Sequence, residues 1–277
     1  MKILIRGAGD IATGIALRLY RAGMQVVMTD LPAPTAIRRT VCFSQAIILG
    51  EMTVEDVTAR RAETPDQAEA LLAQGLIPVL ADPDCTCRTR LRPDALVDAI
   101  LAKRNLGTKI DDAPIVVGIG PGFTAGEDCH AVVETMRGHT LGRVIYRGSA
   151  LPNTNIPGLI GGYAGERVLR APAEGIFCQK LEIGAVVRAG DIAGEVAGQP
   201  MRCTIDGVLR GILADGTPVF RGMKAGDVDP RCKPEYCCTA SDKALAVGGG
   251  VLEAVLHLHH RNRPAEKQSQ FTGGALL

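Results

Sequence analysis

The chain has 277 residues, carries 31 Lys and Arg against 30 Asp and Glu, and is 46% hydrophobic. This apolar content excludes wholesale disorder, and the length suggests about two domains. A net charge of +1 and the absence of Trp leave little positive field or stacking surface for a nucleic-acid partner. No apolar run approaches the roughly 20 residues of a membrane span, and the first ten residues do not resemble a signal peptide. The sequence therefore predicts a cytoplasmic protein with neither a nucleic-acid nor a membrane partner.

The first half of the chain predicts alternating strands and helices in a doubly wound parallel sheet. Strands are expected at 2–6, 25–29, 77–81, 115–119 and 143–146. Helices are expected at 10–22, from Thr53, from Thr64 to Gly75, at 93–104 and from Thr124 to about Arg137. Capping residues support several of these helices. The pattern predicts a Rossmann-like α/β nucleotide-binding domain over residues 1–170.

The second half predicts a different architecture. Residues 171–231 indicate a small all-β module, because short strand-like segments alternate with turns such as Asp206-Gly207. Residues 232–260 indicate a helical segment that packs back on the first domain. A break is expected at Gly248–Gly250, because three glycines inside a helix cost about 3 kcal/mol relative to alanine. Residues 261–277 are expected to form a flexible tail. The helix at Val251–Leu258 is either buried in the monomer or the contact of a homodimer.

A glycine motif follows the first expected strand and opens the first expected helix. Gly7 permits a tight turn, Gly9 lets the backbone approach a pyrophosphate, and Ala12 allows close packing of helix and strand. Together with Asp10 at the helix start, these residues are predicted to bind a cofactor. Asp30, at the end of the next strand, is predicted to bind a ribose hydroxyl and to repel a 2′-phosphate. The motif therefore favours an NAD-like dinucleotide, and the alternative is a strand–helix turn that binds nothing.

A second glycine loop follows the strand at 115–119. Gly118, Gly120 and Gly122 are predicted to face the same crevice from the opposite side, because the first and fourth strands are neighbours in the common doubly wound order. The alternative is a loop that only prepares the helix cap at Thr124. His130 is interpreted as an ordinary surface histidine.

The cysteines give no metal site. Cys85 and Cys87 follow the third expected strand, and Arg88 and Arg90 are predicted to lower a thiol pKa there. Neither this pair nor a later group has the spacing of structural zinc, and the roles of both stay open. The nine cysteines of the chain form no disulfide framework, which favours a reducing compartment. The later group comprises Cys232, Cys237 and Cys238.

Several segments together resemble one known family. They include GAGDIATGIALRLYRAGMQVVMTDLP (7–32), IRRTVCFSQAI (37–47) and SDKALAVGGGVLEAVL (241–256). These segments are similar to the YqeB family, and the resemblance extends to about residue 260. It implies an accessory protein that matures selenium-dependent molybdenum hydroxylases of the xanthine-dehydrogenase type. The implied partners are a client hydroxylase and a small-molecule nucleotide, and the implied cofactor is a molybdopterin dinucleotide.

The all-β segment resembles the barrel-sandwich hybrid of biotinyl and lipoyl domains. In those carriers a modified lysine lies at the hairpin between the two halves. The corresponding stretch here, Ala197–Arg202, contains no lysine. The resemblance therefore implies a lid or docking surface without a swinging arm.

Three functional hypotheses follow from these patterns. The first is a maturation factor that binds a nucleotide or a molybdopterin-type cofactor. The second is an NAD-dependent oxidoreductase acting on a small substrate, which the glycine motif favours. The third is a non-catalytic chaperone or docking protein. No catalytic base is identifiable, so whether the chain is an enzyme stays open.

Overall fold

The structure, a computed structural model, describes residues 1–262. The first part of the chain forms a nine-stranded sheet in the order β10-β9-β7-β6-β1-β2-β5-β4-β3. Its strands pair in parallel except at the two edges, where β9–β10 and β3–β4 are antiparallel. These strands are β1 (Lys2–Arg6), β2 (Gln25–Asp30), β3 (Glu51–Val54), β4 (Val57–Ala62), β5 (Ile77–Ala81), β6 (Ala95–Asp98), β7 (Val116–Ile119), β9 (Ala131–Val133) and β10 (Val144–Ile145). A separate pair consists of β8 (Thr124–Ala125) and β11 (Gly148–Ser149).

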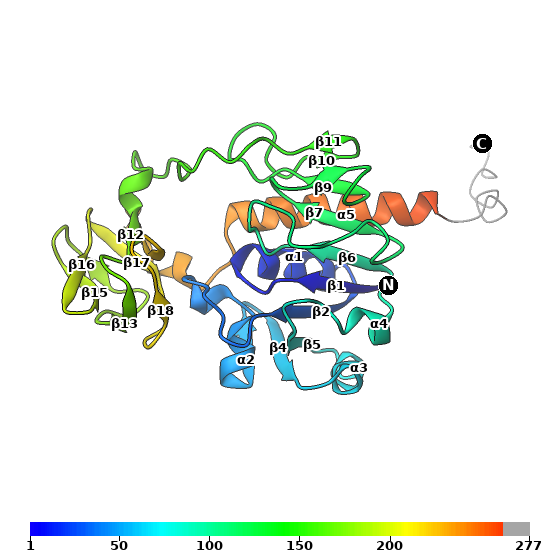
Figure 1. The fold of residues 1–277 in the computed structure, drawn as a ribbon, viewed down its shortest axis with the longest axis horizontal. Helices are drawn as coiled ribbons and strands as arrows, with labels where there is room; N and C mark the ends of the chain where they lie inside the picture. The colour runs from blue at the N-terminus through cyan, green and yellow to red at the C-terminus, as the bar shows by residue number, and fades with distance from the viewer. Residues whose placement is uncertain (263–277) are drawn as a thin grey trace, which may run out of the picture.

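Helices cover both faces of this sheet (Figure 1). They are α1 (Asp10–Arg21), α2 (Gln45–Leu49), α3 (Pro65–Ala73), α4 (Arg88–Leu91) and α5 (Asp242–Arg261), with 3-10 turns η1 (Arg39–Val41), η2 (Gly165–Arg167) and η3 (Pro234–Cys237). Because side chains alternate along a strand, Ile3 and Ile5 of β1 pack with α1 and α5, whereas Leu4 faces the core that contains Leu71 of α3. The predicted start of α3 at Thr64 is confirmed, since the Thr64 hydroxyl accepts from the Gln67 N–H at 3.2 Å as the N-cap.

Residues 168–229 form two four-stranded antiparallel sheets, called the β module below. One has the order β12-β19-β17-β14 and the other β16-β15-β13-β18. Phe177 and Leu209 are fully buried in the apolar core between them. Figure 1 shows this module at one end of the molecule. Its strands are β12 (Val168–Arg170), β13 (Gly175–Gln179), β14 (Val186–Val187), β15 (Ile192–Val196), β16 (Gln199–Arg202), β17 (Gly207–Ile212), β18 (Pro218–Val219) and β19 (Lys224–Asp229).

The predicted Rossmann-like doubly wound fold is wrong. No helix connects β6 to β7 or β7 to β9, and both edges of the sheet are antiparallel. The helix expected at 93–104 contains strand β6, and the helix expected from Thr124 contains β8 and β9. The helix expected from Thr53 lies in the β3–β4 hairpin. Short apolar runs such as 95–101 fit a buried strand as well as a helix, so periodicity could not distinguish the two.

The predicted barrel-sandwich hybrid is also wrong as a fold class. The strands of the β module divide into two separate four-stranded antiparallel sheets. Turn signals located these strands but did not determine which of them pair, because strand partners are distant in sequence. β12 pairs with β19, for example, through Val168 and Asp227.

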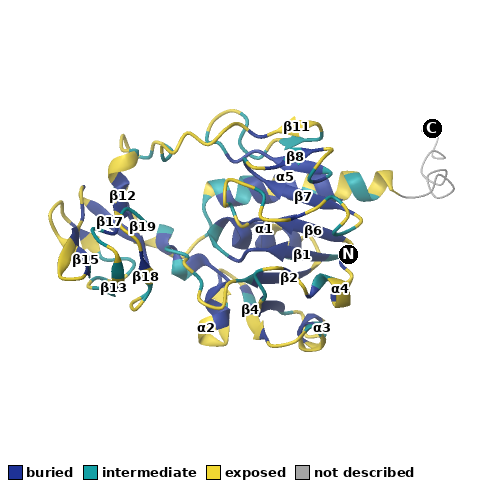
Figure 2. Cartoon of the chain, in the orientation of Figure 1, coloured by how far each residue is buried: buried dark blue, intermediate teal, exposed yellow. Residues whose placement is uncertain are grey.

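Helix α5 runs without the predicted break at Gly248–Gly250. A Cβ atom on Gly248 would lie 2.9 Å from the Gly14 carbonyl oxygen of α1, and one on Gly250 would overlap the Gly142 carbonyl oxygen. The glycines therefore allow α5 to lie against α1 and the 142 loop, and this packing offsets their poor helix propensity. Figure 2 shows that much of α1 and α5 is buried. The predicted tail over 261–277 lies, from residue 263 onward, outside the described residues.

The β module contacts the first part of the chain at the start of η1 and in the residues just before it. The Arg39 guanidinium donates to the Ile212 carbonyl at 3.0 Å and to Gln179 at 2.8 Å. Gly211 lies so close to Ile37 that a Cβ atom there would be 3.0 Å from the Ile37 carbonyl oxygen. These contacts place the β module beside the carboxyl ends of the parallel strands. Within residues 1–262, no helix has both the length and the apolar character needed to cross a membrane.

Candidate functional site

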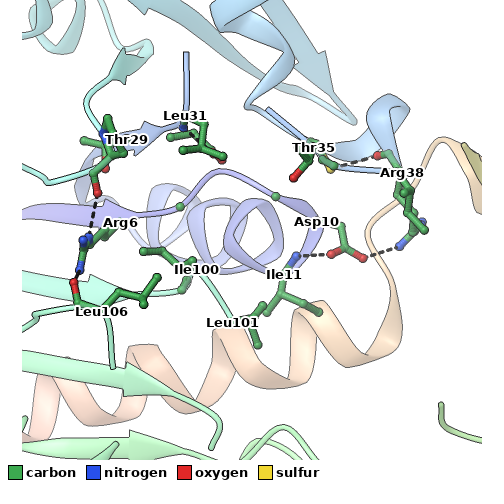
Figure 3. Close-up of a pocket in the computed structure, with 18 of the residues that line it drawn as sticks. Arg6, Asp10, Ile11, Thr29, Leu31, Thr35, Arg38, Ile100, Leu101 and Leu106 are labelled. Carbon is green, nitrogen blue, oxygen red and sulfur yellow. Dashed lines mark hydrogen bonds and ion pairs between the residues drawn. The ribbon is translucent and has the colours of Figure 1, made fainter. Parts of the chain in front are cut away.

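A cavity of about 570 Å³ lies at the carboxyl ends of β1, β2 and β6. The β1–α1 turn, the segment after β2 and the loop after β6 form most of its walls (Figure 3). Lys224 of the β module also lines it. The carboxyl edge of parallel strands is where α/β proteins commonly bind ligands. The residues that line the cavity therefore come from five separate stretches of the chain.

The two glycines of the β1–α1 turn have different tasks. Gly7 has a φ of +102°, and a Cβ atom there would lie 2.9 Å from the Ala99 carbonyl oxygen. Gly7 is therefore required for the fold, because it brings the turn against the loop after β6. Gly9 has an ordinary extended backbone (φ −71°), and a Cβ atom there would meet nothing within 4 Å. Gly9 thus exposes its backbone to the cavity. Ala12 is fully buried and packs in the core.

Asp30 connects the end of β2 to the glycine turn. Its carboxylate accepts from the Ala8 N–H at 2.7 Å and from the Leu31 N–H at 2.7 Å. Burial raises the pKa of Asp30, and these two N–H groups oppose that shift. The carboxylate lines the cavity, and in the described residues no cation pairs with it. Asp30 can therefore accept a hydrogen bond from a ligand hydroxyl.

Asp10 begins α1 at the cavity wall. Its carboxylate accepts from the Ile11 N–H at 2.9 Å and pairs with the Arg38 guanidinium at 3.3 Å. Figure 3 shows this chain of contacts at one end of the cavity. Because a carboxylate already occupies the first turn of α1, the helix N-terminus is unfavourable for a second anion. Asp10 lines the cavity without forming a phosphate cradle.

Large aliphatic side chains form the middle of the cavity. Leu31 (44% exposed), Ile100 (36%) and Leu106 (41%) are among the exposed large hydrophobic residues of the chain. Figure 3 places Leu31 on one side and Ile100 and Leu106 across from it. Such facing aliphatic walls suit a flat ring, because ligand pockets are mostly apolar with a few placed polar groups.

The cavity floor contains a buried charge network. Arg6 is 7% exposed and donates to the Pro83 carbonyl, the Leu106 carbonyl and Thr108 at 3.0 to 3.1 Å. Its Nη1 lies 3.4 Å from the carboxylate of Asp98, which is 2% exposed. All of these partners belong to the protein, so Arg6 holds the loops around the cavity.

The second glycine loop lies outside the cavity. The structure inserts β6 between β1 and β7, so the loop after β7 is not adjacent to the β1–α1 turn. Cβ atoms on Gly118, Gly120 and Gly122 would collide with Phe123, Thr135 and Arg104, respectively. These three glycines therefore permit close packing of the chain on itself. The expectation that both loops share one crevice is wrong, because the neighbour of β1 on this side is β6.

The expectation of a thiol with a lowered pKa is wrong for Cys87. Cys85 and Cys87 are both buried, and a hydrogen bond with Cys85, together with burial, raises the pKa of the Cys87 thiol well above its usual value. Arg88 pairs with Asp112 at 3.1 Å and Arg90 with Asp66 at 2.8 Å, so both guanidinium groups have carboxylate partners.

A labelling experiment tests this assignment. During brief exposure of the native protein to iodoacetamide, the exposed Cys232 and Cys238 should react first. Cys87 should react about 100-fold more slowly, because alkylation needs an accessible thiolate. Peptide mapping by mass spectrometry measures both rates. Labelling of Cys87 as fast as that of Cys238 would contradict the assignment.

The structure places His130 outside the cavity, and it adds cavity residues that the sequence did not indicate. His130 is half-buried, and its Nδ1 accepts from the Val116 N–H at 3.0 Å, near the start of β7 and away from the cavity. Arg38 and Lys224 line the cavity, but no binding role was predicted for either of them from the sequence. Arg6, a charge at the end of an apolar strand, was the one visible signal of a buried polar site.

A curated protein is similar to almost the whole chain. The chain is 51% identical over 266 residues to a protein named "Uncharacterized protein YqeB" from Escherichia coli strain K12. The match covers 96% of this chain and 49% of the relative. This identity supports the resemblance to the YqeB family. The chain spans about half the length of the curated relative that it matches, and no family model matches the sequence.

Solved structures resemble only parts of this chain. A succinylglutamate desuccinylase/aspartoacylase from Rhodobacter sphaeroides is 26% identical over 23% of this chain and 22% of its own, with a TM-score of 0.20. The ectoine utilization protein EutE (DoeB) from Ruegeria pomeroyi is 21% identical over 30% of this chain and 28% of its own (TM-score 0.22). An aspartoacylase family protein from Mesorhizobium loti is 11% identical over 53% of this chain and 60% of its own (TM-score 0.24). Scores this low give no information about activity.

The sheet order and the missing crossover helices also correct the sequence-based description of this chain. The description of the fold as a Rossmann domain with a barrel-sandwich module is therefore wrong. The name of the matched YqeB protein mentions neither selenium nor molybdenum, so the comparison does not support those roles.

Proposed function

We propose that this chain binds a small molecule that joins a flat ring to free hydroxyl groups, as a nucleoside does, in the cavity beside the β1–α1 turn. One observation carries this proposal: Leu31, Ile100 and Leu106 stay exposed inside a cavity that also presents the Asp30 carboxylate. The aliphatic side chains can pack on the two faces of a ring, and the carboxylate can accept a hydrogen bond from a hydroxyl group. Gly9 leaves room for the ligand to reach the backbone.

The variant Gly9→Ala tests the proposal. The added methyl group meets no protein atom and the backbone conformation suits alanine, so the fold should tolerate it. We expect the melting temperature to stay within about 2 °C of the wild type. Because the methyl group projects into the cavity, the affinity for adenosine should fall about 10-fold, as measured by isothermal titration calorimetry.

The matched control is Gly165→Ala, which adds the same methyl group at an equally open position outside the cavity. This control should bind adenosine like the wild type. Equal affinity of the wild type and Gly9→Ala would contradict the proposed site.

The biological setting implied by the family resemblance stays a prediction. It comprises maturation of selenium-dependent molybdenum hydroxylases, a client hydroxylase as partner, a nucleotide or molybdopterin-type ligand, and a cytoplasmic location. The alternatives of an NAD-dependent oxidoreductase and of a chaperone stay predictions too, as does a homodimer. Co-purification of the chain with a molybdenum hydroxylase would support the first setting.

A further inference from the structure

Three cations line the cavity, and two of them are already bound to the protein. Arg6 donates to Thr108 and two carbonyl oxygens beside Asp98. Arg38 pairs with Asp10 and also donates to the carbonyls of Tyr236 and Thr239 at 3.0 and 3.2 Å. Lys224, the third cation, is exposed. Within residues 1–262 it has no ion pair or side-chain hydrogen bond.

Lys224 comes from a different part of the fold than the other residues of the site. It begins β19, so the β module contributes it to a cavity whose other walls belong to the nine-stranded sheet and its loops. The module is fixed against the cavity by the contacts of Arg39. A cation held at a cavity wall without a counter-ion attracts a ligand anion.

The N-terminus of α1, which also lines the cavity, gives no competing anion site. The Asp10 carboxylate accepts from the Ile11 N–H in the first turn of that helix. A ligand anion at this turn would therefore meet a carboxylate. Both Asp30 and Asp84 add negative charge along the same cavity. The charges thus favour an anion near Lys224 and disfavour one at the glycine turn.

We propose that Lys224 binds a phosphate group of the ligand, so that the β module provides the anion subsite of the cavity. The inference rests on the proposed function, which assigns the ring to the aliphatic walls and the hydroxyl groups to Asp30. A phosphate is favoured over a carboxylate because lysine acts as a point charge, whereas paired recognition of a carboxylate uses a free arginine fork.

One further observation concerns the cavity wall. The buried Nε atom of Arg38, a residue that is 7% exposed and lines the cavity, has no hydrogen-bond partner within the described residues. Arg38 therefore keeps one unpaired donor at the wall of the cavity.

The test compares adenosine with ADP, which differ by the phosphate groups, on four forms of the full chain. These are the wild type, Lys224→Ala, Lys224→Arg and Lys180→Ala. Lys180 is the matched control, because it is an exposed lysine of the same module that pairs with Glu195 outside the cavity. Isothermal titration calorimetry gives the affinity ratio of ADP to adenosine for each form.

The wild type should bind ADP about 10-fold more tightly than adenosine, and Lys224→Ala should reduce this ratio to about 1. Lys224→Arg and Lys180→Ala should keep most of the preference. A ratio unchanged in Lys224→Ala, or a wild type that binds adenosine without preferring ADP, would overturn this inference and leave the proposed function standing. Binding of neither probe would overturn both.

Discussion

Gly250→Ala should lower the stability of the protein by about 3 kcal/mol, because overpacking a close contact forces the backbone apart. A Cβ atom at this position would overlap the Gly142 carbonyl oxygen and lie 2.8 Å from a Val133 methyl group. Neither neighbour can rotate away, since one is backbone and the other belongs to the buried strand β9. Chemical denaturation followed by circular dichroism measures the change.

The adjacent glycine provides the control for this prediction. Gly249 is exposed, and a Cβ atom there would meet nothing within 4 Å. Gly249→Ala should therefore stabilise the protein by about 0.5 to 1 kcal/mol, because alanine has the better helix propensity. If both variants shift stability in the same direction, the close packing of α5 on the 142 loop is not what keeps the helix continuous.

Asp98→Ala should cost about 3 to 5 kcal/mol, because it leaves a buried guanidinium without its carboxylate. Asp98 is 2% exposed and accepts from the Thr108 hydroxyl at 2.6 Å, and Arg6 beside it is 7% exposed. The loss should also reduce adenosine binding, since the same network holds the loop that carries Leu106. Equilibrium unfolding in urea measures the stability change.

An exposed ion pair gives the comparison. Asp66 pairs with Arg90 at 2.8 Å, and both side chains are mostly in solvent. Asp66→Ala should cost less than about 1 kcal/mol, as exposed pairs usually do. A cost for Asp98→Ala as small as that for Asp66→Ala would show that the buried network does not hold the cavity floor.

Local signals predicted the first strands and helices of the chain well. Strand β1, helix α1, strand β2, helix α3 and strand β5 all lie close to their expected ranges. Each of them combines a clear apolar period with a capping or turn residue, as Thr64 does for α3. Local periodicity and local caps were sufficient to predict these elements, because the tertiary contacts favour the same secondary structure as the local sequence does.

The later elements depended on contacts that are distant in sequence. Residues 95–98 form a strand because β1 and β7 bind it on both sides, and nothing in its own apolar run distinguishes this from a helix. By local propensity, Gly248 and Gly250 favour a helix break. In the fold, they are necessary because a side chain at either position would meet the carbonyl oxygen of Gly14 or Gly142, respectively. Tertiary contacts therefore overrode local propensity at both places.

The candidate site was predicted in part. Gly7, Gly9, Asp10 and Asp30 line the cavity, because the β1–α1 turn and the end of β2 are adjacent in any parallel β1–β2 pair. Lys224 could not be predicted, since its position depends on how the β module contacts the segment at Ile37.

Methyl NMR of the full chain with labelled Ile and Leu side chains tests the central claim most directly. Adenosine should shift the methyl resonances of Leu31, Ile100 and Leu106, because a ring between them perturbs the nearby methyl groups. The resonances of Ile156 and Leu159, which are exposed outside the cavity, should not move. Saturating shifts at these three residues, with none at methyl groups outside the cavity, are the predicted result. Shifts confined to methyl groups outside the cavity, or none at all, would contradict the claim that this cavity is the ligand site.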